Sequence, residues 1–80
     1  LFRSMAENKK KLLGVLDEVL LFSFELIVFE LEGKAPEDSR VKQIRELCQE
    51  LADAGVYQFQ TNCDDEKLFE QIQTFAQNEG

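Results

Sequence analysis

The stretch VLLFSFELIVFELEG, residues 19–33, decides the fold, because its composition fits a membrane span, a β-strand or a helix. Residues 12–31 are long enough to cross a bilayer. This segment also contains four acidic residues: Asp17, Glu18, Glu25 and Glu30. Each of them would cost roughly 2.5–3.5 kcal/mol near the bilayer centre. We therefore expect a soluble protein that does not enter a membrane.

The Phe, Ile and Val residues of the same stretch leave a strand, with a break near Leu21, as an alternative. In such a strand Phe22 and Phe24 share one face, but Ile27 and Phe29 make the opposite face apolar as well. A helix fits the pattern better, because polar residues recur at intervals of seven and keep one edge of a helix polar. These residues are Ser4, Lys11, Glu18, Glu25 and Glu32.

Both ends of this helix carry recognisable signals. Ser4 and Glu7 have the S-x-x-E spacing of a capping box, in which each side chain bonds a free backbone N–H at the helix start. Gly33 suits the left-handed position after a helix, and Pro36 follows it closely. The sequence thus predicts a helix over residues 4–32, about 44 Å long.

The apolar side of this helix divides into two rows of residues. The first seam has the alternating spacing of three and four that faces a partner helix; it consists of Leu12, Val15, Val19, Phe22, Leu26 and Phe29. The second seam consists of Leu13, Leu16, Leu20, Phe24, Ile27 and Leu31. A helix with two such seams needs two sets of contacts.

Two shorter helices are predicted over residues 36–54 and 63–77. Pro36 suits the start of the first, and Gly55 suits its end. The second has Asn62 or Asp64 as its N-cap. The fold class is therefore all-α, with one long N-terminal helix packed by two shorter helices in a single domain.

The connection VYQFQTN, residues 56–62, remains open between a strand, a loop and a helix. If it is extended, Tyr57 and Phe59 are two apart and both side chains point inward.

Composition argues against most other functions. The net charge is −7, which disfavours binding to nucleic acids and to anionic membranes. Histidine is absent, and with it the commonest general base and metal ligand. No nucleophile–base pair or phosphate-binding glycine loop is visible, and the acidic residues 64–66 complement a helix start better than they form a metal site. We expect no enzyme, no cofactor and no metal.

The two cysteines, Cys48 and Cys63, lack the spacing of a metal or redox motif. Cys48 lies on an apolar helical face, whereas Cys63 lies in a polar connection. So few cysteines indicate reduced thiols rather than a disulfide scaffold. We expect an intracellular protein, cytoplasmic or nuclear.

The surplus of apolar surface predicts the function. Laid end to end, the two shorter helices match the long helix in length and cover one seam, which leaves the other exposed. We therefore expect a non-catalytic protein–protein interaction module that dimerises as a helical bundle or binds an amphipathic helix of another protein. The residues predicted to bind the partner are those of the first seam: Leu12, Val15, Val19, Phe22, Leu26 and Phe29. The sequence does not decide which seam faces the core.

Two alternatives remain. The shorter helices could flank the long helix on both sides and bury both seams. The chain also begins at Leu1 and not at Met, as a piece of a longer protein would. Residues 47–59, LCQELADAGVYQF, resemble the helix–Gly–helix step of armadillo-type repeats. This resemblance implies membership of an α-solenoid, although no second copy of the stretch is visible. The start at Leu1 is the reason to expect a terminal or regulatory segment of such a protein or of a larger enzyme.

Overall fold

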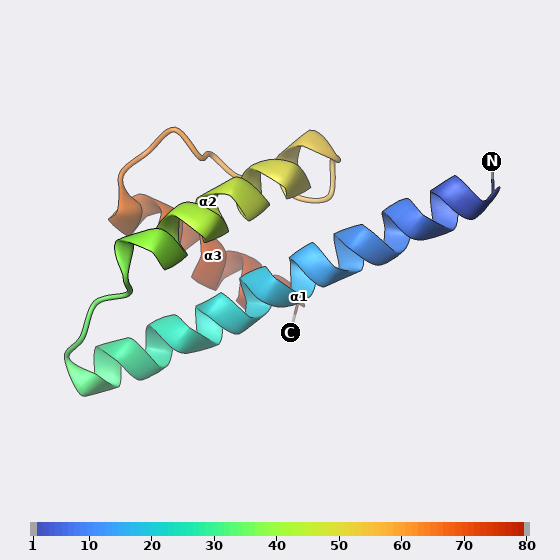
Figure 1. The fold of residues 1–80 in the computed structure, drawn as a ribbon. Coiled ribbons are helices and arrows are strands. Elements are labelled where there is room, and N and C mark those ends of the chain that lie inside the picture. The colour runs from blue at the N-terminus through green and yellow to red at the C-terminus, as the bar shows by residue number, and fades with distance from the viewer. Residues whose placement is uncertain (1, 80) are drawn as a thin grey trace.

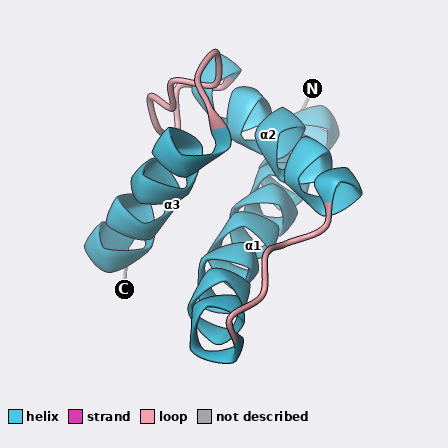
Figure 2. Cartoon of the chain, turned by 90° about the vertical axis from the view of Figure 1, so that its left-hand side faces the viewer, coloured by secondary structure: helices cyan, strands magenta, loops and turns pink. Residues whose placement is uncertain are grey.

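The described residues fold into three α-helices, which Figures 1 and 2 show from two directions. The computed structural model describes the backbone of residues 2–79 and the side chains of residues 5–79. Over this range it contains α1 (Phe2–Glu32), α2 (Asp38–Asp53) and α3 (Asp65–Glu79), and no strand. The all-α prediction is confirmed, and the strand alternative for residues 22–32 is wrong. Among the described residues, no helix is long and apolar enough to cross a membrane.

The predicted helix ends are close to the observed ones. Helix α1 begins at Phe2 rather than Ser4, and the Ser4 side chain lies outside the described part of the chain. Helix α2 begins later than predicted, at Asp38, because Glu37 still has an extended backbone (φ −67°, ψ 145°). Helix α3 runs from Asp65 to Glu79, so it begins and ends two residues later than the predicted range 63–77.

Glycines end the first two helices in the same way. Gly33 (φ 68°) and Gly55 (φ 72°) adopt the left-handed conformation that other residues rarely tolerate. The N–H of Lys34 donates to the carbonyl of Phe29 (2.8 Å), and the N–H of Val56 donates to that of Leu51 (2.9 Å). These are the six-to-one bonds of a Schellman motif, which satisfies free carbonyls at a helix end. At the start of α3, Asp64 accepts the N–H of Lys67 (2.9 Å) and is therefore the N-cap.

Helices α2 and α3 both pack against the same section of α1, and the first turns of α1 extend beyond them (Figure 1). The expectation that they lie end to end is wrong. The connection between them leads the chain back, so that α3 begins beside α2 (Figure 2). Arg45 of α2 fixes this return: its guanidinium donates to the carbonyl oxygens of Thr61 (2.6 Å) and Cys63 (2.8 Å) and to Asp65 (2.6 Å).

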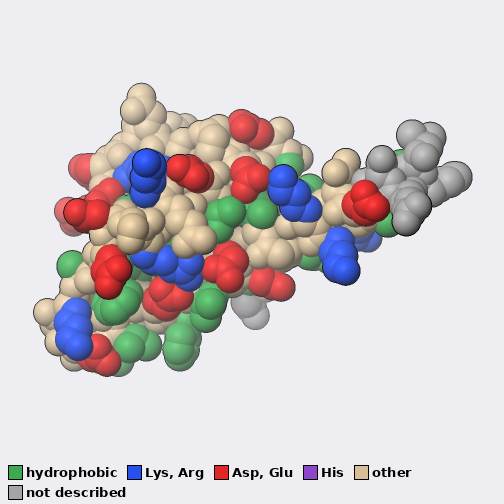
Figure 3. All heavy atoms as spheres, viewed as in Figure 1, with side chains coloured by type: hydrophobic (Ala, Val, Ile, Leu, Met, Phe, Trp, Pro, Cys, Tyr) green, Lys and Arg blue, Asp and Glu red, His purple; other side chains and the backbone are tan. Residues whose placement is uncertain are grey.

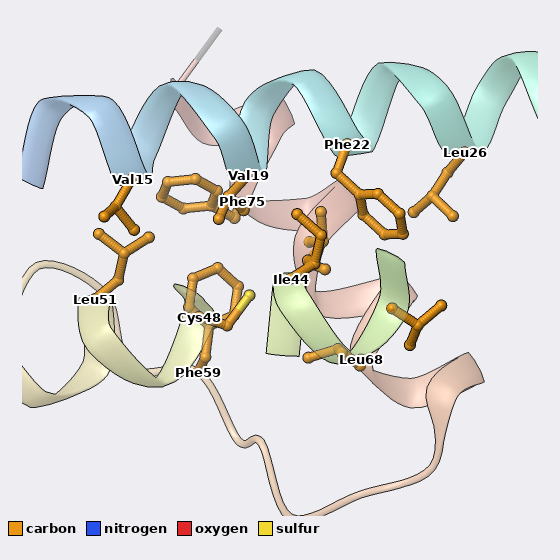
Figure 4. Packing of buried hydrophobic residues seen from close by; sticks show 12 residues of the cluster. Val15, Val19, Phe22, Leu26, Ile44, Cys48, Leu51, Phe59, Leu68 and Phe75 are labelled. Atoms are coloured by element: carbon orange, nitrogen blue, oxygen red, sulfur yellow. The ribbon is translucent and has the colours of Figure 1, made fainter. Parts of the chain in front are cut away.

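The buried apolar side chains form one cluster between the three helices (Figure 4). In this cluster α1 contributes Val15, Val19, Phe22 and Leu26; α2 contributes Val41, Ile44, Cys48 and Leu51; α3 contributes Leu68, Ile72 and Phe75; and the connection contributes Phe59. The rings of Tyr57 and Phe59 both lie against Phe75, with centroids 4.7 and 5.2 Å away. The connection is therefore irregular and points its two aromatic side chains inward, as an extended segment would.

Candidate interaction surface on helix α1

The first seam, which the sequence predicts as the partner-binding surface, faces the core of the chain itself. Val15, Val19, Phe22 and Leu26 point from α1 toward Leu51, Ile44 and Phe75 (Figure 4), and Val19 and Phe22 have no exposed surface. Leu12 and Phe29, at the two ends of the seam, are partly buried. The assignment of these six residues to a partner surface must be corrected, because α2 and α3 already cover most of the seam.

The second seam remains exposed. Four of its large side chains expose half or more of their surface: Leu13 (52%), Phe24 (63%), Ile27 (50%) and Leu31 (83%). Leu16 and Leu20 are partly buried, and Leu21, at the edge of the seam, is 49% exposed. Apolar side chains gather on the side of α1 that lies away from α2 (Figure 3). The alternative in which the shorter helices cover both seams is therefore wrong for the described chain.

A groove borders the N-terminal part of the second seam. It has a volume of about 440 Å³ and lies between α1 and Val56, the residue that follows the end of α2. Its lining is mostly apolar and includes Met5, Leu12, Leu13 and Leu16, together with the polar residues Asn8 and Lys9. Met5 and Val56 are themselves exposed, at 61% and 45%. The groove thus extends the apolar surface beyond the seam itself.

An ion-pair cluster lies along the polar edge of α1. Arg40 of α2 donates two hydrogen bonds to the carboxylate of Glu25 (2.7 and 3.1 Å) and one to Glu18 (3.1 Å). Its guanidinium carbon also lies 5.7 Å from the centre of the Phe22 ring. The hydrogen bonds that Arg40 donates to Glu25 are the main cause of the raised pKa of Arg40, and burial partly offsets this rise. Because Glu18 and Glu25 lie two turns apart on one edge, this cluster fixes the rotation of α1 about its axis.

This cluster does not follow from the sequence pattern. The spacing of Glu18 and Glu25 led to the prediction of a solvent-facing edge, whereas their side chains are only 46% and 28% exposed. The spacing shows that the two carboxylates share one edge of α1. It does not show which basic residue of another helix lies opposite them.

The charges around the second seam are unevenly distributed. Lys9 and Lys10 lie near its N-terminal end, and both are exposed. Glu30 and Glu32 lie at its C-terminal end, where Glu32 forms an exposed pair with Lys34 (3.5 Å). The surface thus has a basic end and an acidic end.

The acidic residues at the start of α3 have structural roles. Asp64 caps the helix, and Asp65 accepts the bond from Arg45. Among the described residues, no three Asp, Glu or Cys side chains lie close enough to hold a metal ion. Cys48 is buried, and burial raises the pKa of its thiol to about 12. A thiol with so high a pKa is a poor nucleophile.

Comparisons with protein-family models, with curated proteins and with solved structures find no match to this chain. The surface of α1 is therefore the basis for a functional assignment.

Proposed function

We propose that this chain is a non-catalytic interaction module that self-associates through the second seam of α1. The observation that carries the proposal is the row of exposed apolar side chains, in which Leu31 is 83% and Phe24 is 63% exposed. Single exposed apolar residues are ordinary, but a contiguous row of them along one helix marks an interaction surface.

A second copy of the chain is the partner that requires the fewest assumptions. A two-fold axis brings the same surface of two copies together, so each copy supplies the apolar cover that the other lacks. A half-exposed large side chain presents on the order of 100 Å², so five of them on each of two copies give about 1,000 Å², near the lower limit for a specific interface. The groove beside Leu13 and Leu16 adds to this area.

The test is the molar mass of the chain over a range of concentrations, measured by sedimentation equilibrium. We expect a dimer that dissociates on dilution. The combined substitutions Phe24→Glu and Ile27→Glu should give a monomer with unchanged helix content, because both side chains are at least half exposed and take no part in the buried cluster.

The matched control places the same two charges elsewhere. Ser39 and Gln58 are exposed and lie outside α1. The double variant Ser39→Glu, Gln58→Glu should therefore dimerise like the original chain. If the original chain is a monomer at every concentration, or if the Phe24→Glu, Ile27→Glu variant still dimerises, the proposal is wrong.

The alternative is a helical segment of a larger enzyme or an α-solenoid, with the second seam buried against the rest of that protein. The resemblance to an armadillo-type step lends it little support, because residues 56–64 are not helical and separate Gly55 from α3. A chain that is a monomer at every concentration would favour this alternative.

A further inference from the structure

We infer that the two copies pair with their α1 helices antiparallel, so that Leu31 of one copy packs into the groove beside Leu13 of the other. This inference rests on the proposed self-association and adds its geometry. Three observations on the described surface support it: the position of Asp17, the charges at the two ends of the second seam, and the groove.

Asp17 distinguishes the two possible directions. The residues Leu13, Asp17, Leu20, Phe24, Ile27 and Leu31 are four, three, four, three and four positions apart, so they form one continuous line along α1. In a parallel two-fold pair every residue of this line faces its own copy, and the two Asp17 carboxylates meet. In an antiparallel pair centred near residue 22, each Asp17 faces Ile27, so the two like charges lie apart.

The charges at the ends of the seam favour the same direction. With the centre near residue 22, antiparallel pairing brings Lys10 of one copy within about 3 Å, along the axis, of Glu32 of the other, an end that also carries Lys34. Parallel pairing would place lysines against lysines and glutamates against glutamates. Such juxtaposition of like charges is a common means of excluding a wrong orientation.

The groove supplies a site for the most exposed apolar side chain. In the antiparallel pair centred near residue 22, Leu31 of one copy lies opposite Leu13 of the other, at the border of the groove. Leu12, Leu13 and Leu16 make the lining of the groove apolar there. The two-fold axis repeats this contact at the other end of the pair.

Cross-linking between introduced cysteines tests the direction. Gly14 and Glu32 are 18 residues apart, which is five full turns, so both lie on one edge of α1. A Cβ atom added at Gly14 meets no atom within 4 Å, and Glu32 is exposed, so Gly14→Cys and Glu32→Cys should both fold. Each of these two variants also carries Cys63→Ser, whereas Cys48 is left unchanged because it is buried. A short bis-maleimide is the cross-linker, and Gln58→Cys, outside α1, is the control.

In the antiparallel pair, position 14 of one copy lies about 3 Å along the axis from position 32 of the other, whereas the two copies of position 14 lie about 24 Å apart. We therefore expect cross-links when the two variants are mixed and little cross-linking of either variant alone. In a parallel pair, positions 14 and 32 of the two copies lie about 27 Å apart along the axis, so the mixture would show no cross-link between the two variants.

The measured mass separates the two proposals. A dimer that cross-links only in the mixture supports both of them. A dimer in which each variant cross-links to itself overturns the antiparallel arrangement and leaves self-association intact. A dimer without any cross-link between these positions overturns the antiparallel arrangement and places the interface elsewhere. A monomer overturns both proposals.

Discussion

Two phenylalanines of α1, two positions apart, should respond in opposite ways to removal of the ring. Phe22 has no exposed surface; its ring lies 5.7 Å from that of Phe69 and beneath the Arg40 guanidinium. Phe24 is 63% exposed and lies on the second seam. The comparison therefore separates the core role of the first seam from the surface role of the second.

The expected magnitudes differ widely. Replacing a buried Phe by Ala costs about 3–5 kcal/mol, which is a large part of the stability of a small domain. For Phe24→Ala in the monomer we expect a change within about 0.5 kcal/mol, because little burial is lost and Ala is the better helix former. If Phe22→Ala does not fold, Phe22→Leu should still be destabilised by about 1.5 kcal/mol.

The assay is urea denaturation followed by far-UV circular dichroism. It is carried out at one protein concentration below the dissociation constant of the dimer and at another well above it. The loss from Phe22→Ala should be similar at both concentrations. Phe24→Ala should lose stability only at the higher concentration, where dimerisation stabilises the folded chain by mass action. If Phe24→Ala is as costly as Phe22→Ala at low concentration, the assignment of the two seams is wrong.

Four further predictions test other parts of the structure. Arg40→Ala should lower the free energy of unfolding by about 1–2 kcal/mol in urea denaturation, and Arg40→Lys should recover only part of it, because Lys lacks the fork that binds Glu25; full recovery would contradict this. Arg45→Ala should speed amide hydrogen exchange in residues 56–64 without changing the rate in α1, and equal changes in both would argue against its local role. An aromatic disulfide reagent should label Cys63 in the folded chain and Cys48 only after unfolding. Because burial raises the pKa of Cys48 to about 12, the unfolded thiol loses its proton first, so stability should fall from about pH 9 to pH 12, and Cys48→Ala should remove that slope.

The number and limits of the helices follow largely from local chemistry, and this part of the fold is predictable. Gly33 and Gly55 end helices because only glycine readily adopts a positive φ, and Asp64 begins one because its carboxylate accepts a free N–H. The exact first residue of a helix is harder to predict. Pro36 indicates that a helix begins nearby, but it does not determine that Glu37 is still extended and that the helix begins at Asp38.

The relative placement of α2 and α3 was not predictable in the same way. Each of these helices has an apolar stripe that must pack against another element. Their summed length matches that of α1, which led to the prediction that they lie end to end. The chain instead turns back, because Arg45 binds carbonyl oxygens of Thr61 and Cys63 on the returning segment. Contacts of this kind join residues far apart in sequence and leave no periodic pattern.

The choice between the two seams depended on a feature that the sequence contains, namely the position of Asp17. The line that continues the second seam from Leu13 to Leu20 passes through this residue, whereas the first seam includes no charged residue. With the first seam inside, Asp17 remains exposed, and Glu18 and Glu25 come within reach of Arg40. In the proposed assembly the same carboxylate disfavours a parallel pair, in which the two Asp17 side chains would meet.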